Sequence, residues 1–263
     1  MTDFIDTNRS HWNAVTPGHL HSDFYDVDSF TAGRDTIDEV EEELVGEVSG
    51  RSLLHLQCHF GMDTMSWTRR GATATGVDFS HVAIDAATSL ASDLNLNTRF
   101  RVGNVLDLRL EEEFDIVFTS HGVLGWLPDL RPWGETVAEH LKEGGKFVVV
   151  DSHPVLGTFD DERTDGKMRL RYDYFSRAAL AFEETGSYAD PNGPVTNTLY
   201  RIHPLEDVFG GLIDAGLTIT GFNEYDRLAW QAMPHMEQDD DGWWHLGAGQ
   251  PRVPLMFSVT ATR

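Results

Sequence analysis

The chain has 263 residues, of which 40% are hydrophobic and 11% aromatic, a composition that supports a sizeable core and argues against general disorder. Its 20 lysines and arginines against 43 aspartates and glutamates give a formal net charge of −23. We therefore do not expect the protein to bind nucleic acid or an anionic membrane over a broad surface, because both need a basic surface. Cys58 is the single cysteine, so no disulfide can form within the chain.

The first residues, MTDFIDTNRS, lack the basic stretch and apolar run of a signal peptide. A run of about 18 apolar residues, which a membrane helix would need, does not occur. We therefore expect a cytoplasmic protein that acts on a small-molecule substrate, with no nucleic acid and no membrane as partner. The acidic composition fits either a high-salt cytoplasm or a merely acidic protein, and the oligomeric state, monomer or homodimer, stays open.

Residues 1–35 are rich in aromatic side chains but contain Pro17 and Gly18, which are expected to break any long helix. An irregular or short-helical lid is the resulting prediction. The first regular helix is expected to begin at Thr36, because Thr36 and Glu39 have the spacing of a capping box. Apolar residues then recur at helical spacing as far as Gly50.

The following part of the chain alternates between two kinds of element. Strands are expected at residues 52–56, 73–77, 98–102, 114–119 and 146–151, and helices at residues 62–70, 80–94 and 130–142. This alternation is typical of a doubly wound α/β fold with a mostly parallel sheet.

The alternation is interrupted twice. Residues 153–203 show no clean periodicity, and alternation then resumes with a helix at 205–215 and a strand at 217–222. Residues 225–253 contain too many prolines and glycines for the helix that a parallel crossover needs, so the last strand, 255–261, is predicted to be antiparallel. Long irregular stretches in a compact fold are usually functional.

The loop after the first strand lies at the carboxyl edge of the predicted sheet, where ligands of such folds bind. Gly61 allows the backbone to approach a ligand closely. Asp78 ends the second strand, 17 residues later, where an acid can accept hydrogen bonds from both ribose hydroxyls of a nucleoside cofactor.

Five segments in this order resemble the class I S-adenosylmethionine-dependent methyltransferases. They are LLHLQCHFGMDT (53–64), GVDFS (76–80), VGNVLDL (102–108), FDIVFTSHGVLGWLPDL (114–130) and LKEGGKFVVVDSHP (141–154). The resemblance implies an α/β, Rossmann-like, mostly parallel seven-stranded sheet with an antiparallel last strand. It further implies a cofactor-binding domain at 36–151 and 204–263, a lid at 1–35 and a substrate-recognition insertion at 152–203.

The resemblance also implies roles for individual residues toward S-adenosyl-L-methionine, whose product is S-adenosyl-L-homocysteine. The expected cofactor-binding residues are Tyr25 of the lid, Gln57, Cys58, His59 and Gly61 of the loop, Asp63, Asp78 at the ribose, Phe79 against adenine, Asn104 and Val105 at the adenine edge, and Ser120 at the methionine amine. The chain departs from the family's loop pattern. His55 stands at the usual acid, and Gln57 and His59 stand at the first two glycines, so Asp63 is the candidate replacement for the acid.

The implied reaction moves a methyl group to an O or N atom of a small, ring-bearing molecule, and alignment of the reacting atoms supplies much of the catalysis. A general base helps when a hydroxyl or a protonated amine is methylated, and His121 and His153 are the candidates because they follow the fourth and fifth strands. No metal is expected, since no HExxH motif occurs and His55 and His59 do not lie on one helix.

The lid and the two irregular stretches are the expected sites of acceptor recognition. The aromatic and sulfur-containing candidates, with one histidine, are Trp12, His21 and Tyr25, then Tyr172, Tyr174, Phe175, Phe182 and Tyr188, then Trp230, Met233, Met236, Trp243 and Trp244. Arg169, Arg171 and Arg201 are candidates for pairing with a substrate acid. Two alternatives stay open: a cofactor-binding protein of the same fold without turnover, and an NAD-dependent oxidoreductase, which predicts a parallel last strand.

Overall fold

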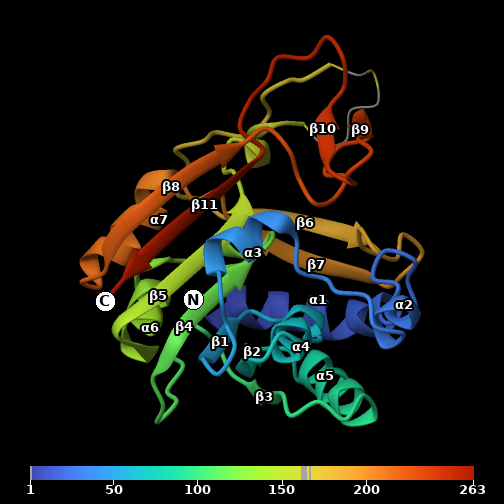
Figure 1. The fold of residues 1–263 in the computed structure, drawn as a ribbon. Helices are drawn as coiled ribbons and strands as arrows, with labels where there is room; N and C mark the ends of the chain where they lie inside the picture. The colour runs from blue at the N-terminus through green and yellow to red at the C-terminus, as the bar shows by residue number, and fades with distance from the viewer. Residues whose placement is uncertain (1, 161–164, 166) are drawn as a thin grey trace.

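The computed structural model describes residues 2–160, 165 and 167–263. Its centre is a seven-stranded sheet in the order β3-β2-β1-β4-β5-β11-β8 (Figure 1). The strands are β1 Ser52–Leu56, β2 Thr73–Asp78, β3 Arg99–Val102, β4 Phe114–Ser120, β5 Leu141–Ser152, β8 Thr218–Tyr225 and β11 Met256–Thr262. Strands β3, β2, β1, β4 and β5 pair in parallel, whereas β11 is antiparallel to both β5 and β8. The predicted mostly parallel sheet with an antiparallel last strand is confirmed.

Both faces of the sheet are covered. Successive residues of its central strands point to opposite faces, and both sets are buried. On one face Val117 of β4 packs in a core with Trp133 of helix α6 (Arg131–His140) and Leu212 of helix α7 (Leu205–Asp214). On the other face Phe118 packs with Val40 of helix α3 (Glu39–Val45) and Trp67 of helix α4 (Met62–Arg69). Helix α5 (His81–Asp93) contributes to a third core.

The strand order reverses at β1, which lies between β2 and β4. The chain runs outward from β1 to β2 and β3, and then returns to build β4 and β5 on the other side. At such a reversal the loops after neighbouring strands diverge and leave a crevice at the carboxyl edge. The loops after β1, β2 and β4 meet at this edge.

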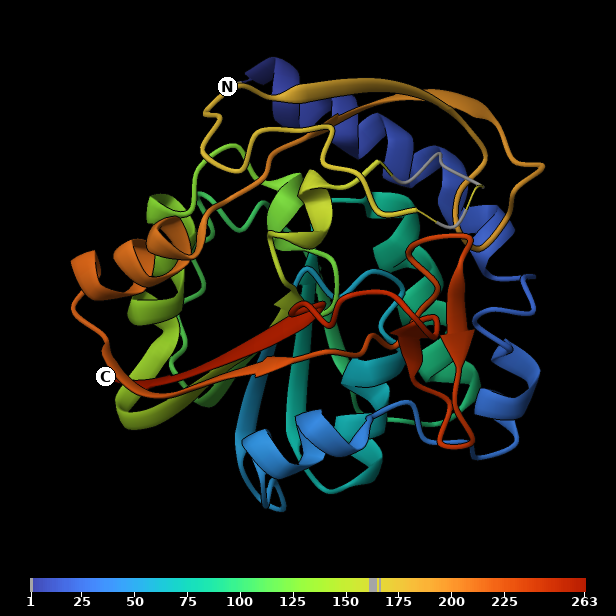
Figure 2. The same cartoon turned by 90° about the horizontal axis from the view of Figure 1, so that it is seen from above.

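The N-terminal segment differs from the prediction, because helix α1 runs without interruption from Thr2 to His19. Pro17 lies in its last turn, where its missing N–H removes only one helical hydrogen bond. Phe4, Asn8 and Val15 are buried on one face, and the helix lies beside strand β7 (Val195–Tyr200; Figure 2). A short helix α2, Val27–Thr31, follows.

Helix α3 begins later than predicted. Asp38, not Thr36, caps it: the Asp38 carboxylate accepts from the backbone N–H of Glu41, and the Glu41 carboxylate accepts from that of Asp38. The capping box is therefore displaced by two residues. Helix α6 also ends before the predicted position, because the chain is already extended in β5 from Leu141.

The two irregular stretches contain short elements that the sequence did not indicate. Strand β6 (Leu180–Thr185) and β7 form an antiparallel hairpin, and β9 (Met236–Gln238) pairs with β10 (Trp244–Leu246). Single 3-10 turns, η1 Leu124–Trp126 and η2 Leu156–Thr158, follow β4 and β5. In Figure 1 the β6–β7 hairpin and the β9–β10 segment both lie at the carboxyl ends of the parallel strands. Within the described residues, no helix has the length and apolarity required to cross a bilayer.

Candidate functional site

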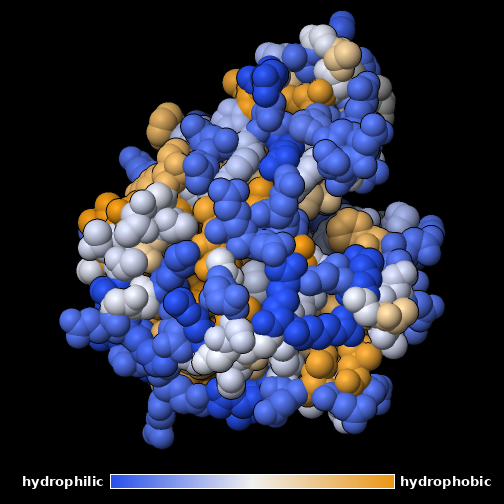
Figure 3. Space-filling view, in the orientation of Figure 1, coloured by the Kyte–Doolittle hydropathy of each residue, from blue (hydrophilic) through white to orange (hydrophobic). Residues whose placement is uncertain are grey.

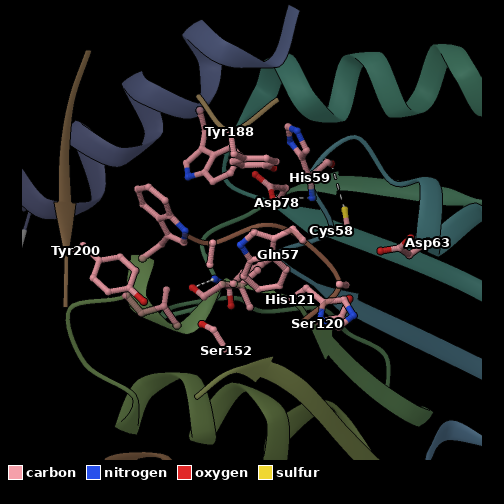
Figure 4. A pocket seen from close by; sticks show the side chains of 18 of the residues that line it. Gln57, Cys58, His59, Asp63, Asp78, Ser120, His121, Ser152, Tyr188 and Tyr200 are labelled. Atoms are coloured by element: carbon pink, nitrogen blue, oxygen red, sulfur yellow. Dashed lines mark hydrogen bonds between the residues drawn. The ribbon is translucent and has the colours of Figure 1, made fainter. Parts of the chain in front are cut away.

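A cavity of about 630 Å³ lies at the carboxyl edge of the sheet. Its walls come from the loops after β1, β2, β4 and β5, from α1 and the segment after it, from the β6–β7 hairpin, and from the late loop around residue 230. Twelve predicted residues line it: Tyr25, Gln57, Cys58, His59, Gly61, Asp63, Asp78, Phe79, Asn104, Val105, Ser120 and His121. Figure 4 shows several of these side chains around one space.

In the loop after β1, two residues other than glycine adopt backbone conformations that glycine usually takes. Gln57 and His59 have φ of 58° and 50°, in the left-handed region that non-glycine residues rarely adopt. The Gln57 side chain compensates in part by donating from Nε2 to the carbonyl of Val123, at 2.9 Å. Gly61 has φ of 78°, and a Cβ there would lie 2.3 Å from a ring carbon of Phe100. Only glycine therefore fits position 61.

Asp78 is fixed at the end of β2 by the loop itself. Its Oδ2 accepts from the backbone N–H of His59 at 2.9 Å, and its Oδ1 accepts from that of Ser80 at 2.8 Å. Burial raises the pKa of Asp78 to about 6, although these backbone donors act in the opposite direction. The carboxylate faces the cavity between the β1 loop and Phe79, where hydroxyl groups of a ligand can reach its remaining lone pairs.

His55 stands where the loop of the methyltransferase family has an acid, and its side chain carries no charge. His55 is buried, its Nδ1 lies 2.9 Å from the hydroxyl of Thr64, and burial lowers its pKa to about 3. The imidazole is therefore neutral at physiological pH. Asp63, in the first turn of α4, lines the same cavity as His55.

His121 forms an ionic cluster with helix α3. Its Nε2 lies 3.0 Å from Oδ2 of Asp38 and 3.4 Å from Oε1 of the buried Glu41. Burial acts to lower the pKa of His121, but the two carboxylates outweigh it and raise the pKa to about 9. His121 is therefore an imidazolium at neutral pH. The ligand atoms of these three residues lie within 4.8 Å of one another, so they could also hold a divalent cation.

His153 lies away from the cavity. It follows β5, its Nε2 is 3.2 Å from Oε1 of Glu224 on β8, and its Nδ1 accepts from the backbone N–H of Val155. The ring packs edge-on against Phe257. Because no atom of His153 lines the cavity, the geometry offers it a structural role and no contact with a reacting atom.

The N-terminal segment, the loop after β1 and the segment before β7 are joined by hydrogen bonds at the cavity. His19 of α1 lies between them, with Nδ1 3.0 Å from Nε2 of His59 and Nε2 2.7 Å from the hydroxyl of Ser187. The hydroxyls of Tyr25 and Tyr188 are 2.5 Å apart. Burial lowers the pKa of His19 to about 4, so the chain of hydrogen bonds contains neutral rings at physiological pH.

The remaining wall is mainly aromatic. Of the acceptor-recognition candidates, Trp12, Tyr25, Tyr172, Phe182, Tyr188, Trp230 and Met233 line the cavity, whereas His21, Tyr174, Phe175, Met236, Trp243 and Trp244 do not. The sequence interpretation missed Trp126, Ser152 and Tyr200, which also line it. Ser152 ends β5, so its place at a strand end was a usable signal. Trp126, in the turn η1, and Tyr200, on the hairpin, had none.

Residues 53–145 match the family model described as a methyltransferase domain. The seven-stranded sheet with its antiparallel last strand is the fold of the solved S-adenosylmethionine-dependent methyltransferases. The match spans the loop after β1, the end of β2 and the loop after β4, which all line the cavity.

Curated relatives share part of the chain. The chain is similar to a "Ubiquinone biosynthesis O-methyltransferase" of Coxiella burnetii, 29% identical over 109 residues, which is 41% of this chain and 45% of the relative. The protein of the same name from Nitrobacter winogradskyi is 33% identical over 98 residues, 37% of each chain. The aligned segment thus spans less than half the length of these relatives.

Solved structures share the whole fold at low identity. A candidate S-adenosylmethionine-dependent methyltransferase from Listeria monocytogenes has a TM-score of 0.62 and 18% identity, covering 84% of this chain and 94% of the other. The DhpI–SAH complex has a TM-score of 0.59 and 16% identity, covering 99% and 97%. A glycopeptide N-methyltransferase, MtfA, complexed with S-adenosyl-L-methionine has a TM-score of 0.51 and 20% identity, covering 82% and 88%.

Proposed function

We propose that this protein transfers the methyl group of S-adenosyl-L-methionine to an O or N atom of a small, ring-bearing molecule. The observation that carries the proposal is the position of Asp78. Its buried carboxylate lies at the end of β2, against the loop after β1, in a cavity at the reversal of the strand order. That is where a nucleoside cofactor's ribose binds in doubly wound folds.

The comparisons support the same proposal. The matched domain is a methyltransferase domain, its curated relatives carry the name of an O-methyltransferase, and structural neighbours were solved with S-adenosyl-L-methionine, SAH or sinefungin. The proposed cofactor-binding domain comprises residues 36–151 and 204–263. Residues 1–35 and 152–203 are the proposed lid and substrate-recognition insertion, and a cytoplasmic location is part of the proposal.

In this account the chain's residues bind and align the reactants. Asp78 accepts hydrogen bonds from the ribose hydroxyls, Phe79 lies against the adenine, and Asn104 with Val105 lines the adenine edge. The cofactor supplies an activated methyl group on a sulfonium. The loop at residues 57–61 fixes the sulfur end, and the backbone of Ser120 faces the methionine amine.

The acceptor side is a chamber of aromatic rings. Trp12 links it to the cofactor side, because its ring centroid lies 5.1 Å from that of His59 and 5.2 Å from that of Trp126. Such walls favour a flat, ring-bearing molecule, while the hydroxyls of Ser152 and Tyr200 offer polar anchors. Holding the nucleophile in line with the methyl carbon supplies most of the catalysis, on the order of 7–11 kcal/mol in favourable cases.

The proposed role of His121 as general base meets a constraint from its charge. An imidazolium with a pKa of about 9 cannot accept a proton at neutral pH. If His121 is the base, the rate of methyl transfer rises with pH up to about 9. A rate that is level from pH 6.5 to 9 assigns His121 to positioning instead.

The experiment that tests the proposal is calorimetric titration of S-adenosylmethionine, S-adenosylhomocysteine and NADH, with Asp78→Asn and the exposed Asp85→Asn of α5 as matched variants. The proposal predicts micromolar binding of both sulfur nucleosides, lost in Asp78→Asn and kept in Asp85→Asn, and no binding of NADH. Binding of NADH alone would overturn it in favour of an oxidoreductase, although the antiparallel β11 already disfavours that alternative.

A cofactor-binding protein without turnover predicts the same titration, so a second readout separates it. Incubation with S-adenosylmethionine and a panel of phenols and aromatic amines, followed by mass spectrometry of S-adenosylhomocysteine, detects turnover directly. Acceptor-dependent product supports the enzyme. Tight binding with no product across the panel supports the binding protein.

A further inference from the structure

Arg34 is the one lysine or arginine among the described residues that line the cavity. It follows α2, and its Nη2 donates to the carbonyls of Tyr25 and Asp26, at 2.5 and 3.3 Å. These two carbonyls hold the guanidinium at the cavity wall. Within the described part of the chain Arg34 enters no ion pair. Besides the hydrogen bond from Ser29, its charge helps to lower the pKa of Asp26, but no carboxylate among the described residues pairs with it, so the guanidinium can bind an anionic group of a ligand.

The arginines that the sequence suggested for this purpose lie elsewhere. Arg171 pairs with Asp160 at 3.1 Å, and Arg201 donates to the carbonyl of Pro128. Neither these nor Arg169 lines the cavity. An anionic ligand group in the cavity would thus meet Arg34 or the imidazolium of His121, whose Nε2 is already engaged by carboxylates.

Arg34 and Asp63 belong to segments that are tied together. Thr36, two residues after Arg34, shares a 2.9 Å hydrogen bond between its hydroxyl and that of Ser66, which lies on α4 three residues after Asp63. Arg34, Thr36 and Asp63 all line the cavity. A cation and a carboxylate thus face the same space from two segments fixed to each other.

A cation and an acid that line one cavity suit a ligand that carries both a carboxylate and an ammonium. The planar guanidinium matches a carboxylate, and a carboxylate accepts from an ammonium. The place where an acid would ordinarily meet the ammonium is occupied by the neutral His55. The cavity therefore needs another anion for this group, and Asp63 is the acid beside that position.

We propose that Arg34 binds the carboxylate and Asp63 the ammonium of the amino-acid portion of the methyl donor. This inference rests on the proposed function and adds the determinant that recognises the amino-acid end. The amino-acid portion of the methyl donor would then be recognised by the segment after α2 and by α4, and not by the loop after β1. Ligands that lack the carboxylate, or the whole amino acid, then bind without one or both of these contacts.

Truncated ligands separate the two contacts. S-adenosylmethionine carries both groups, decarboxylated S-adenosylmethionine lacks only the carboxylate, and 5′-methylthioadenosine lacks both. Each is titrated by calorimetry into the wild type, Arg34→Gln, Asp63→Asn and the control Arg131→Gln, an exposed arginine at the start of α6. Loss of a charge-assisted hydrogen bond weakens binding by roughly 10- to 100-fold.

We expect Arg34→Gln to weaken S-adenosylmethionine by that factor and to leave decarboxylated S-adenosylmethionine and 5′-methylthioadenosine within about twofold. Asp63→Asn is expected to weaken the binding of S-adenosylmethionine and of decarboxylated S-adenosylmethionine, and to leave the binding of 5′-methylthioadenosine unchanged. Arg131→Gln should change none of them.

Two results would overturn the inference. Unchanged binding of S-adenosylmethionine in Arg34→Gln shows that the guanidinium does not bind the carboxylate. Equal weakening of all three ligands shows that the variant disturbs the fold, and 5′-methylthioadenosine thus serves as an internal control. Failure of the wild type to bind any of the three contradicts the proposed function itself, a pattern distinct from both.

Discussion

Asp38 has two roles at the residue level. Its Oδ1 caps helix α3 by accepting from the backbone N–H groups of Val40 and Glu41, and its Oδ2 faces Nε2 of His121. Oε1 of the buried Glu41 lies 3.4 Å from the same ring nitrogen, and burial raises the pKa of Glu41. The pKa values of His121 and Glu41 are thus higher in the folded protein than in the unfolded chain. The folded cluster therefore keeps its protons up to a higher pH.

Asp38→Asn tests this cluster, because asparagine caps a helix as well as aspartate does but carries no charge. The folded pKa of His121, about 9, lies above the unfolded value of about 6.5. Its stabilisation is complete below about pH 6.5 and is lost as the pH rises through about 9. The variant removes a carboxylate that raises this pKa, so we expect a lower His121 pKa by NMR titration. Its free energy of unfolding should also fall less steeply between pH 6.5 and 9.

Asp85→Asn is the control, because Asp85 is exposed on α5. It should titrate and unfold like the wild type. A histidine pKa near 6.5 for His121 in the wild type, or equal slopes in wild type and Asp38→Asn, contradicts the assignment of an imidazolium held by two carboxylates.

At the scale of elements, the β6–β7 hairpin depends on helix α1. Asn8 is fully buried, with Nδ2 donating to the carbonyl of Leu199 and Oδ1 accepting from its N–H, both at 2.8 Å. One turn further along, Nδ1 of His11 lies 2.7 Å from the hydroxyl of Thr196. Side chains of α1 thus form hydrogen bonds with the outer edge of β7. Figure 2 shows the helix lying beside this strand.

Asn8→Ala leaves both backbone groups of Leu199 without a partner, and we expect it to lower the free energy of unfolding by roughly 2–4 kcal/mol. Hydrogen exchange should become faster in α1 and in β6–β7 together, because each stabilises the other. Ser10→Ala, an exposed change on the same helix, should have an effect within about 0.5 kcal/mol. Faster exchange in α1 alone would show that the hairpin does not depend on the helix.

Helix α1 also shows why sequence reasoning failed there. Positions 4, 8, 11, 15 and 19 form its buried stripe, but three of them are Asn8, His11 and His19. A search for apolar periodicity therefore finds no helix, and Pro17 argues against one. The central strands β1 and β4 were predictable because they are buried on both faces and mostly apolar. The position of the capping box was not, because both Thr36 and Asp38 precede a glutamate by three residues.

The part of the cavity built by strand ends was largely predictable for a similar reason. Its residues lie at strand ends, so the alternation of strands and helices already brings Asp78, Ser120 and the loop at 57–61 to one edge. Arg34, Trp126 and Tyr200 come from segments whose place depends on tertiary packing. His153 illustrates the opposite error, because a strand end alone did not determine which way its side chain points.

For the whole molecule, the acidic surface is the dominant property. Hydrophilic side chains cover most of the face seen in Figure 3. A formal net charge of −23 on 263 residues opposes compaction, because like charges repel more strongly in the folded state. Salt weakens this repulsion, since the Debye length falls from about 10 Å at 0.1 M to about 3 Å at 1 M.

We therefore expect the unfolding temperature to rise by several degrees between 0.1 and 2 M KCl. Chloride is the anion to use because sulfate stabilises proteins by a separate mechanism. Differential scanning calorimetry measures the shift. An unchanged or lower unfolding temperature would show that self-repulsion is not a major term in the stability of this protein.

The central claim is that one cavity holds the methyl donor along the edge of the sheet, with the acceptor chamber beside its sulfur. A crystal structure with bound S-adenosylhomocysteine tests this most directly. The account predicts ribose hydroxyls at Asp78, the amino acid between Arg34 and Asp63, and the sulfur directed toward Trp12 and Trp126. A nucleoside bound outside this cavity, or one whose ribose does not contact Asp78, would contradict it.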